Sequence, residues 1–448
     1  MQKVLLVGNA PLPSENTSSR PAAGLRTWQF LQALLAAGLE VKLICIAMPE
    51  CYEQEPTYQT EQISERYSKV VISKQDVDLV KRVQHEHDAI KADLIVSVNT
   101  FPSYIVAQLD SELPLWADLN GWIMAEAQAH AFKTDTNDYL PHYLEMENTI
   151  LKEADKFSVV SDAQKFTVLG ELGAMGRLNK ESFAYNFVQQ VANGTEWFEG
   201  EREAADFPEL FKNVPENAFV ALWLGGYNTW VDEEALFKGV VEAMRQCEKL
   251  YFVSTGGGIK GLDNKTFTKF KYMIDNSEFS ERFVFLGWVE TEQIPYIYKR
   301  AHAGLNVDRA CVETLTGARN RINEMMKFGL PVVTTLGSEI SYEVMINSCG
   351  LGVQSGAVGE AIVRMYEGWR SEAGDFILYG QKGQQYIQEK CNYRATVRPL
   401  IEWIANLGVA PDRGVRLSSG IYARVRGGMR YLREKGVKKF MQKVRQKL

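Results

Sequence analysis

A segment near residue 320 carries charged and polar side chains that could bind an anion. An apolar run, 303–307, leads through a polar loop to a predicted helix, 320–328, with Arg319 just before it and Arg321 in its first turn. Helix N-termini and guanidinium groups both attract phosphate. Glu324, on the same helix, offers a carboxylate that accepts hydrogen bonds from hydroxyl groups. The segment therefore predicts a site for a ligand with phosphate and hydroxyl groups, such as a sugar nucleotide.

A glycine pair at another strand end could approach the same anion. The loop 225–230, with sequence GGYNTW, directly follows a predicted strand, 219–224. Paired glycines allow backbone N–H groups to approach a phosphate closely. A diphosphate gains negative charge as its bond to a sugar breaks, and cationic side chains with N–H donors can stabilise that charge without a metal. We therefore expect Arg319 and Arg321 to act as catalytic cations.

Composition and charge limit the class of protein. A chain of 448 residues exceeds one ordinary core and predicts two or three domains. The formal net charge of −6 argues against a dedicated nucleic-acid binder. The six cysteines show neither paired spacing nor a histidine at metal-ligand spacing, which argues against a disulfide framework and a zinc site. The apolar run 4–7 predicts a first strand rather than a signal peptide, so we expect a cytoplasmic protein.

The elements that must position these residues form two alternating series of apolar runs and helical patterns. The predicted strands of the first series are 4–7, 41–46, 94–98, 115–119 and 157–160. Those of the second series are 219–224, 250–254, 283–286, 304–307 and 332–335. Such alternation is typical of βαβ units around a parallel sheet. We therefore predict an α/β fold with two Rossmann-like, doubly wound domains facing a cleft, with ligands at the carboxyl ends of the strands.

The run NEMMKFGLPVV, residues 323–333, carries a resemblance to a known family. It is similar to the Glu-Ala-Met-(Ala)-x-Gly-x-Pro-Val-Val segment that closes the donor site of retaining GT-B glycosyltransferases of group 1, which are family 4-like. The resemblance covers about residues 1–405 and is strongest over 219–333. It implies sugar transfer from a nucleoside diphosphate donor with retention. It also implies no metal and no cofactor beyond the sugar nucleotide as co-substrate.

The resemblance assigns a ribose-binding role to Glu324, which occupies the second position of the family's Glu-x7-Glu motif. Thr316 stands where the first glutamate is usual, and Glu313 is a possible substitute for that carboxylate. The segment 320–324 (NRINE) resembles an Asn-Lys-x-x-Glu variant with arginine in place of lysine. Lys238 would be the lysine of a family Lys-Gly pair. The expected donor-binding residues are Gly225, Gly226, Asn228, Thr229, Lys238, Glu313, Asn320 and Glu324.

The first domain is expected to bind the acceptor, a saccharide or a lipid-linked glycan. A long loop, 8–20, follows its first strand, and strand-end loops of this length are often functional. The resemblance implies a His or Asp beside the transferred sugar, and Asp118 at the end of another strand is the expected catalytic carboxylate. Its alternative role is a turn-forming aspartate. The other expected acceptor-side residues are Asn9, Arg20, Arg26, Asn120 and Gly121.

The C-terminal segment 412–448 differs in charge from the rest of the chain. It contains twelve Lys or Arg against two acidic residues, and apolar residues recur in it at helical spacing. This pattern is typical of an amphipathic helix on an anionic membrane surface, with a solvated or protein-docked basic helix as the alternative. We therefore expect peripheral association with the inner face of the cell membrane. Nucleic acid is not an expected partner.

The predicted boundaries follow from these patterns. They are an acceptor-side domain at 1–190, a linker at 191–217, a nucleotide-sugar domain at 218–380, C-terminal helices at 381–411 that pack back toward the first domain, and the basic tail at 412–448. Two alternatives to a glycosyltransferase remain at this point. One is a nucleotide-sugar epimerase of the same fold, and the other is a non-catalytic scaffold that binds nucleotide sugars.

Overall fold

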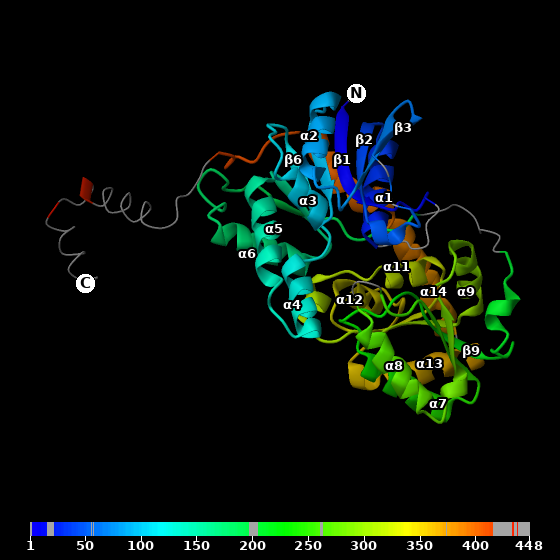
Figure 1. Ribbon diagram of the computed structural model, residues 1–448. Coiled ribbons are helices and arrows are strands. Elements are labelled where there is room, and N and C mark those ends of the chain that lie inside the picture. The colour runs from blue at the N-terminus through cyan, green and yellow to red at the C-terminus, as the bar shows by residue number, and fades with distance from the viewer. Residues whose placement is uncertain are drawn as a thin grey trace.

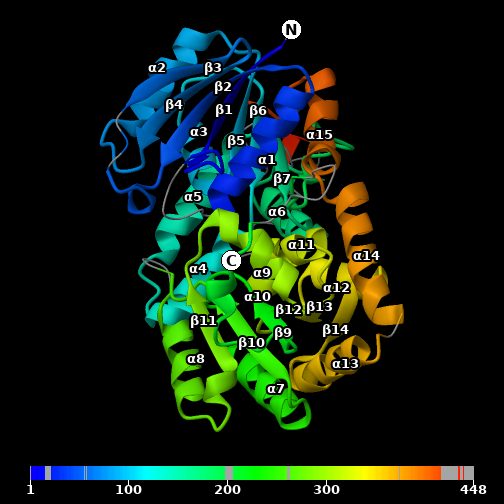
Figure 2. The same cartoon turned by 90° about the vertical axis from the view of Figure 1, so that its right-hand side faces the viewer.

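The computed structural model describes residues 2–15, 22–54, 56, 58–196, 205–259, 263–372 and 374–414, together with 432, 433 and 437. Arg20 and most of the predicted tail therefore lie outside the described residues. Two sheets form the centres of two domains, which lie one above the other in Figures 1 and 2.

The first sheet has eight strands in the order β3-β4-β2-β1-β5-β6-β7-β8. Its strands are β1 (Lys3–Ala10), β2 (Glu40–Ala47), β3 (Gln59–Ser64), β4 (Tyr67–Ser73), β5 (Leu94–Val98), β6 (Leu115–Leu119), β7 (Lys156–Val159) and β8 (Val188–Gln190). All neighbours pair in parallel except β3, which runs antiparallel to β4. The strand order reverses beside β1, as in doubly wound sheets that bind ligands at that edge.

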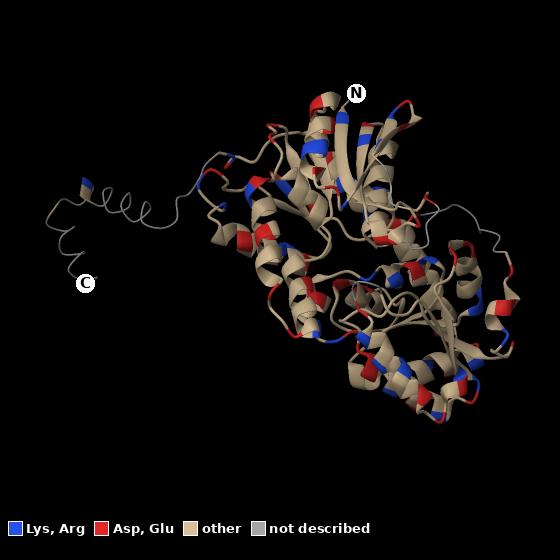
Figure 3. Ribbon diagram, viewed as in Figure 1, with Lys and Arg blue, Asp and Glu red and all other residues tan. Residues whose placement is uncertain are grey.

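The second sheet has six parallel strands in the order β11-β10-β9-β12-β13-β14. Its strands are β9 (Phe219–Trp223), β10 (Leu250–Thr255), β11 (Phe283–Gly287), β12 (Ala303–Asn306), β13 (Val332–Thr335) and β14 (Gly350–Val353). None of these strands contains a charged residue, as the tan ribbons of Figure 3 show. Charged site residues of this domain must therefore come from loops and helices.

Helices cover both faces of each sheet (Figure 1). Those of the first half are α1 (Ala22–Ala36), α2 (Leu79–Ile90), α3 (Thr100–Val106), α4 (Ile123–Thr134), α5 (Leu140–Glu153) and α6 (Asp162–Ala174). Those that follow are α7 (Glu233–Gln246), α8 (Lys265–Asp275), α9 (Ile294–Arg300), α10 (Val312–Thr316), α11 (Asn320–Lys327), α12 (Glu339–Ile346), α13 (Val358–Arg370), α14 (Gly374–Lys390) and α15 (Tyr393–Ala405). The predicted fold class of two doubly wound domains is confirmed.

The chain crosses between the domains twice. The last helix, α15, packs on α1 of the first domain, where Leu400 and Trp403 join the core that contains Phe30. The preceding helix, α14, packs on α11 of the second domain. Where the crossings meet, the Thr195 N–H donates to the Cys391 carbonyl at 2.7 Å. The first domain is therefore completed by residues from the far end of the chain.

The described residues contain no helix that is both long and apolar enough to cross a membrane. In the same part of the chain, no group of three or more His, Cys, Asp or Glu side chains is arranged to hold a metal ion.

Candidate functional site

Glycine backbone forms the surface at the carboxyl ends of β9 and β10. Gly225 and Gly256 have φ values of +100° and +72°, in the left-handed region that favours glycine. A Cβ on Gly256 would lie 2.5 Å from the Gly225 carbonyl, so the two loops touch. No described atom lies within 4 Å of the position that a Cβ on Gly225 would take. The predicted glycine loop therefore presents open backbone, as a phosphate site requires.

Arg321 lies beside this glycine surface. Its Nη2 donates to the Gly226 carbonyl at 2.9 Å, and its guanidinium carbon lies 3.9 Å from the centroid of the Trp223 ring. Its Nη1 is buried and has no hydrogen-bond partner in the described part of the protein. Burial lowers the pKa of this guanidinium to about 10. Arg321 is thus a desolvated cation with an unused donor, which suits an incoming anion.

Three more buried polar atoms near α11 have no hydrogen-bond partner among the described residues. They are the Tyr298 hydroxyl, Asn323 Oδ1 and Thr195 Oγ1. Buried polar groups are normally satisfied, so these three atoms are candidates for contact with a ligand. Sequence reasoning missed all three, because each comes from a different element and no spacing in the sequence links them.

Glu324 lines a small cavity between the two domains. The cavity has a volume of about 40 Å³, and Arg26 and Gln29 of α1 and Asn320 of α11 also line it. Burial raises the pKa of the Glu324 carboxyl, and the Lys327 ammonium, 3.8 Å away, opposes this effect. A space of this size accommodates water but not a sugar nucleotide. The two domains must therefore separate to admit a nucleotide at Glu324.

Arg319 occupies a different environment from Arg321. It is 5% exposed, and its Nε donates to Asp308 at 2.6 Å. Its two terminal nitrogens donate to both oxygens of Glu313, at 3.1 and 2.7 Å. Two carboxylates therefore neutralise Arg319 and use its donors. The structure does not place Arg319 or Glu313 as free groups for the donor, contrary to our expectation. The pair instead holds the loop before α11.

Asp118 also differs from its expected placement. Its side chain is fully buried and accepts two hydrogen bonds from Arg26, at 3.0 and 2.7 Å. The Ser158 hydroxyl donates to the same carboxylate at 2.6 Å, and Arg26 also donates to the Val191 carbonyl at 2.7 Å. This buried ion pair ties β6 to α1 and to the segment after β8. No acceptor could reach Asp118 in this arrangement, because its partners enclose it.

Two other predicted donor residues have partners in the second domain, and one faces solvent. The Asn228 side chain accepts from the Thr229 N–H at 3.1 Å, and the Thr229 hydroxyl donates to Asp263 at 2.9 Å. Both residues lie in the glycine loop, as expected from the sequence. The Lys238 side chain is 68% exposed on α7 and lies 3.8 Å from Glu234. Lys238 is therefore a surface residue, in contrast to the role that the resemblance implied.

Three of the predicted acceptor-side residues of the first domain lie at strand ends. Asn9 lies buried in β1, close to its carboxyl end. Asn120 and Gly121 follow β6, and Gly121 has a φ of +92°. Arg26 belongs to the buried ion pair described above, and Arg20 lies outside the described residues.

Polar contacts join the two domains across the cleft. On α4, the Lys133 ammonium lies 2.6 Å from Asp263 and donates to the Thr266 hydroxyl at 2.8 Å. At the start of α6, the Ser161 hydroxyl donates to the carbonyl of Thr316 at 2.7 Å. Thr316, where the family's first glutamate is usual, thus contributes backbone to a domain contact. Figure 2 shows α4 between the two domains.

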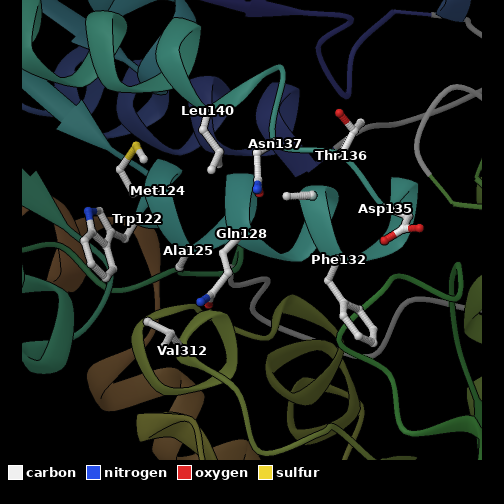
Figure 4. Close-up of a pocket in the computed structure, with 11 residues that line it drawn as sticks. Trp122, Met124, Ala125, Gln128, Phe132, Asp135, Thr136, Asn137, Leu140 and Val312 are labelled. Carbon is white, nitrogen blue, oxygen red and sulfur yellow. The ribbon is translucent and has the colours of Figure 1, made fainter.

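A second cavity lies along α4, outside the predicted site. Its volume is about 610 Å³, and residues from both domains line it (Figure 4). They include Trp122, Ala125, Gln128 and Phe132 of the α4 region and Val312 of α10. None of the residues predicted from the sequence lines this cavity, so its size alone does not identify the site.

No protein-family model and no curated protein sequence matches this chain. Solved structures do match. Sucrose-phosphate synthase from Thermosynechococcus elongatus aligns with a TM-score of 0.66 and 15% identity, over 91% of this chain and 99% of that one. HepE from Anabaena, solved in complex with UDP-glucose, aligns with a TM-score of 0.60 and 15% identity, over 91% and 100%.

WaaG, a glycosyltransferase involved in lipopolysaccharide biosynthesis, aligns with a TM-score of 0.58 and 12% identity, over 91% of this chain and 100% of that one. At such identities the likeness shows the fold. The chain therefore has the GT-B fold, in which two Rossmann-like domains face each other, and its structural neighbours include glycosyltransferases.

Proposed function

We propose that this protein is a metal-independent glycosyltransferase. It moves a sugar, with retention, from a nucleoside diphosphate to a saccharide or lipid-linked acceptor in cell-surface glycan synthesis. The observation that carries this proposal is Arg321, a half-buried cation whose Nη1 is buried and unused, beside the open glycine backbone of Gly225. A diphosphate would supply the anion that this arrangement lacks.

The neighbours guide the choice of donor and acceptor. HepE is solved with UDP-glucose and with UDP, so a UDP-sugar is the first donor to test. WaaG acts in lipopolysaccharide biosynthesis, which supports a glycan of the cell surface as acceptor. The resemblance of residues 323–333 to retaining enzymes supports retention.

The proposed reaction uses this chain's residues to bind and to stabilise charge. Glu324 accepts hydrogen bonds from the ribose hydroxyls, and Arg321 with the glycine N–H groups contacts the diphosphate. As the bond between the sugar carbon and the phosphate oxygen breaks, its electron pair stays on the diphosphate, where Arg321 opposes the growing charge. The acceptor oxygen bonds to the same face of the sugar carbon, and its proton passes to the leaving phosphate.

Thermal unfolding with a panel of nucleoside diphosphates tests the proposal. A diphosphate at about 100 times its dissociation constant should add about 2.7 kcal/mol to stability. Nucleoside monophosphates are the matched control, because they lack the second phosphate. If no nucleoside diphosphate stabilises the protein, the proposed transferase function is contradicted. Donor binding without transfer or hydrolysis would favour the non-catalytic scaffold.

We expect Glu324→Ala to weaken diphosphate binding by about 1.5–3 kcal/mol, through loss of charge-assisted hydrogen bonds to the ribose. Titration calorimetry with UDP measures this change. Glu324→Gln is the matched control, since it keeps the shape and loses the charge, and should weaken binding less. Unchanged affinity in Glu324→Ala would remove this residue from the site.

The basic tail is proposed to hold the protein at the inner face of the cell membrane. The body of the protein ends in an anchored segment, because Asp412 pairs with Arg177 at 2.8 Å and Arg413 donates to the Glu112 carbonyl at 2.9 Å. A deletion that begins after Gly414 therefore keeps these contacts.

We expect this deletion to abolish sedimentation with anionic vesicles and to leave unfolding and UDP binding unchanged. Each basic residue near such a surface contributes about 1 kcal/mol, and salt screens this attraction. The full chain should therefore bind anionic vesicles more strongly at low than at high salt. Neutral vesicles are the control. Vesicle binding that is insensitive to lipid charge and to the deletion would contradict the proposal.

A further inference from the structure

Helix α4 presents one face to the 610 Å³ cavity and another to the cleft between the domains. Gln128 lines the cavity, and helix geometry places Glu126 about 160° around the axis from it. A Cβ on Gly121 would lie 2.7 Å from Glu126 Oε1. The Glu126 carboxyl therefore lies against the backbone at the carboxyl end of β6, which is where doubly wound sheets bind ligands.

The second domain faces the same carboxyl. Helix α10 packs on α4, and the charges of Glu313 and Arg319 both act on Glu126. The Glu126 side chain reaches solvent and forms no hydrogen bond or ion pair with any other described residue. It is thus a carboxyl at the junction of the two domains with its hydrogen-bonding capacity unused. Asp118, by contrast, has its oxygens engaged by Arg26 and Ser158.

Its neighbours make this carboxyl harder to ionise. Although the side chain reaches solvent, protein atoms packed around it displace part of its water and raise the pKa of Glu126 to about 8, with the negative charge of Glu313 adding to the effect and Arg319 opposing it. On α5, the charge of Glu126 in turn helps to raise the pKa of Tyr143 and of Glu147. Carboxyl groups perturbed in this way are concentrated at functional sites.

We propose that Glu126 binds the acceptor, by accepting a hydrogen bond from a hydroxyl group next to the one that receives the sugar. The inference rests on the proposed transferase function and adds its acceptor-side residue. Glu126 takes the place that the sequence assigned to Asp118, at the end of the same strand. The chemistry selects an acceptor that presents a hydroxyl group rather than an anion, because a carboxylate repels negative charge.

A consequence is that acceptor binding should release a proton. A hydroxyl that donates to Glu126 favours the ionised carboxylate and so lowers its pKa from about 8. At neutral pH the free carboxyl is mostly protonated, so binding ionises it. The rate of transfer should therefore rise with pH and level off above the pKa of Glu126.

The position of Glu126 can be tested by chemical labelling. Glu126→Cys is made in a Cys311→Ser background, because the other five cysteines are buried. Iodoacetamide should label the new thiol in the free protein. UDP-glucose, at about ten times its dissociation constant, should slow labelling about tenfold, whereas UDP should leave it unchanged. Equal protection by UDP and UDP-glucose, or no protection by either, overturns the proposal.

The role of Glu126 is tested by Glu126→Gln, with Glu145→Gln on the exposed face of α5 as matched control. Loss of the positioned carboxylate should lower transfer from UDP-glucose to a sugar acceptor by about 100-fold. The dissociation constant of UDP should not change, and the pH dependence near 8 should disappear. A purely structural role would lower stability and leave that pH dependence in place, which overturns the inference. Failure of the parent protein to bind any nucleoside diphosphate would instead refute the proposed function.

Discussion

Arg321→Ala is expected to lower kcat about 10²- to 10³-fold while changing donor affinity much less. The reason is that the charge on the leaving diphosphate grows as its bond to the sugar breaks, so a cation there contributes more to the transition state than to the bound donor. Arg321 is the cation that the structure leaves with an unused donor, Nη1, beside the glycine loop. Steady-state kinetics with UDP-glucose and calorimetry with UDP separate the two effects.

Two observations accompany this prediction. Arg321→Lys, the matched control, keeps the charge but not the planar fork, and should retain more activity than the alanine variant. The stability of Arg321→Ala should not fall, because burial without a carboxylate partner disfavours the charged form and lowers its pKa to about 10. The sign follows from linkage, since a cation with a depressed pKa destabilises the fold below that pKa. Equal activity of variant and parent would identify a structural arginine.

Asp118→Ala is expected to lower the free energy of unfolding by about 3–5 kcal/mol. The substitution leaves the buried guanidinium of Arg26 without the carboxylate that accepts its Nε and Nη2. An uncompensated charge in the interior is costly, whereas removal of both partners is much less so. Unfolding in urea measures the effect.

The matched control is the double variant Arg26→Met with Asp118→Ala, which removes both charges. It should recover a large part of the stability lost in Asp118→Ala alone. One outcome would instead support the acceptor-side catalytic role that the sequence predicted for Asp118. If Asp118→Ala unfolds like the parent but loses transfer with donor binding intact, this carboxylate acts on the acceptor.

The buried strands could be predicted from the sequence because they are short apolar runs between helical patterns. The ten strands predicted in the two series all occur in the structure. Four others gave no such signal. β3 (QTEQIS) is polar and fully exposed, and β4 (YSKVVIS) has only three consecutive apolar residues. β8 is three residues long, and β14 (GLGV) is half glycine. These strands form because an adjacent strand pairs with them, which local sequence does not show.

The site could be predicted in part for a similar reason. Chain position places Asp118 and Gly225 at strand ends and Arg319 and Arg321 at the start of a helix. It does not show that Asp118 meets Arg26, 92 residues away, or that Arg319 meets two carboxylates. Contacts made only in the folded protein determine whether a charged side chain faces the cleft or is neutralised by another side chain. Glu126 could not be predicted from the sequence, because the groups of the second domain that lie opposite it are far away in the chain.

The two adjacent crossings at Thr195 and Cys391 limit how the cleft can open. A single tether would let one domain twist and swing in any direction. Two crossings held side by side by a hydrogen bond instead define a hinge axis. Rotation about that axis should cost less energy than any other relative motion of the domains. Opening then has essentially one degree of freedom. A single spectroscopic distance across the cleft, from α4 near Lys133 to the loop at Asp263, would report the whole movement.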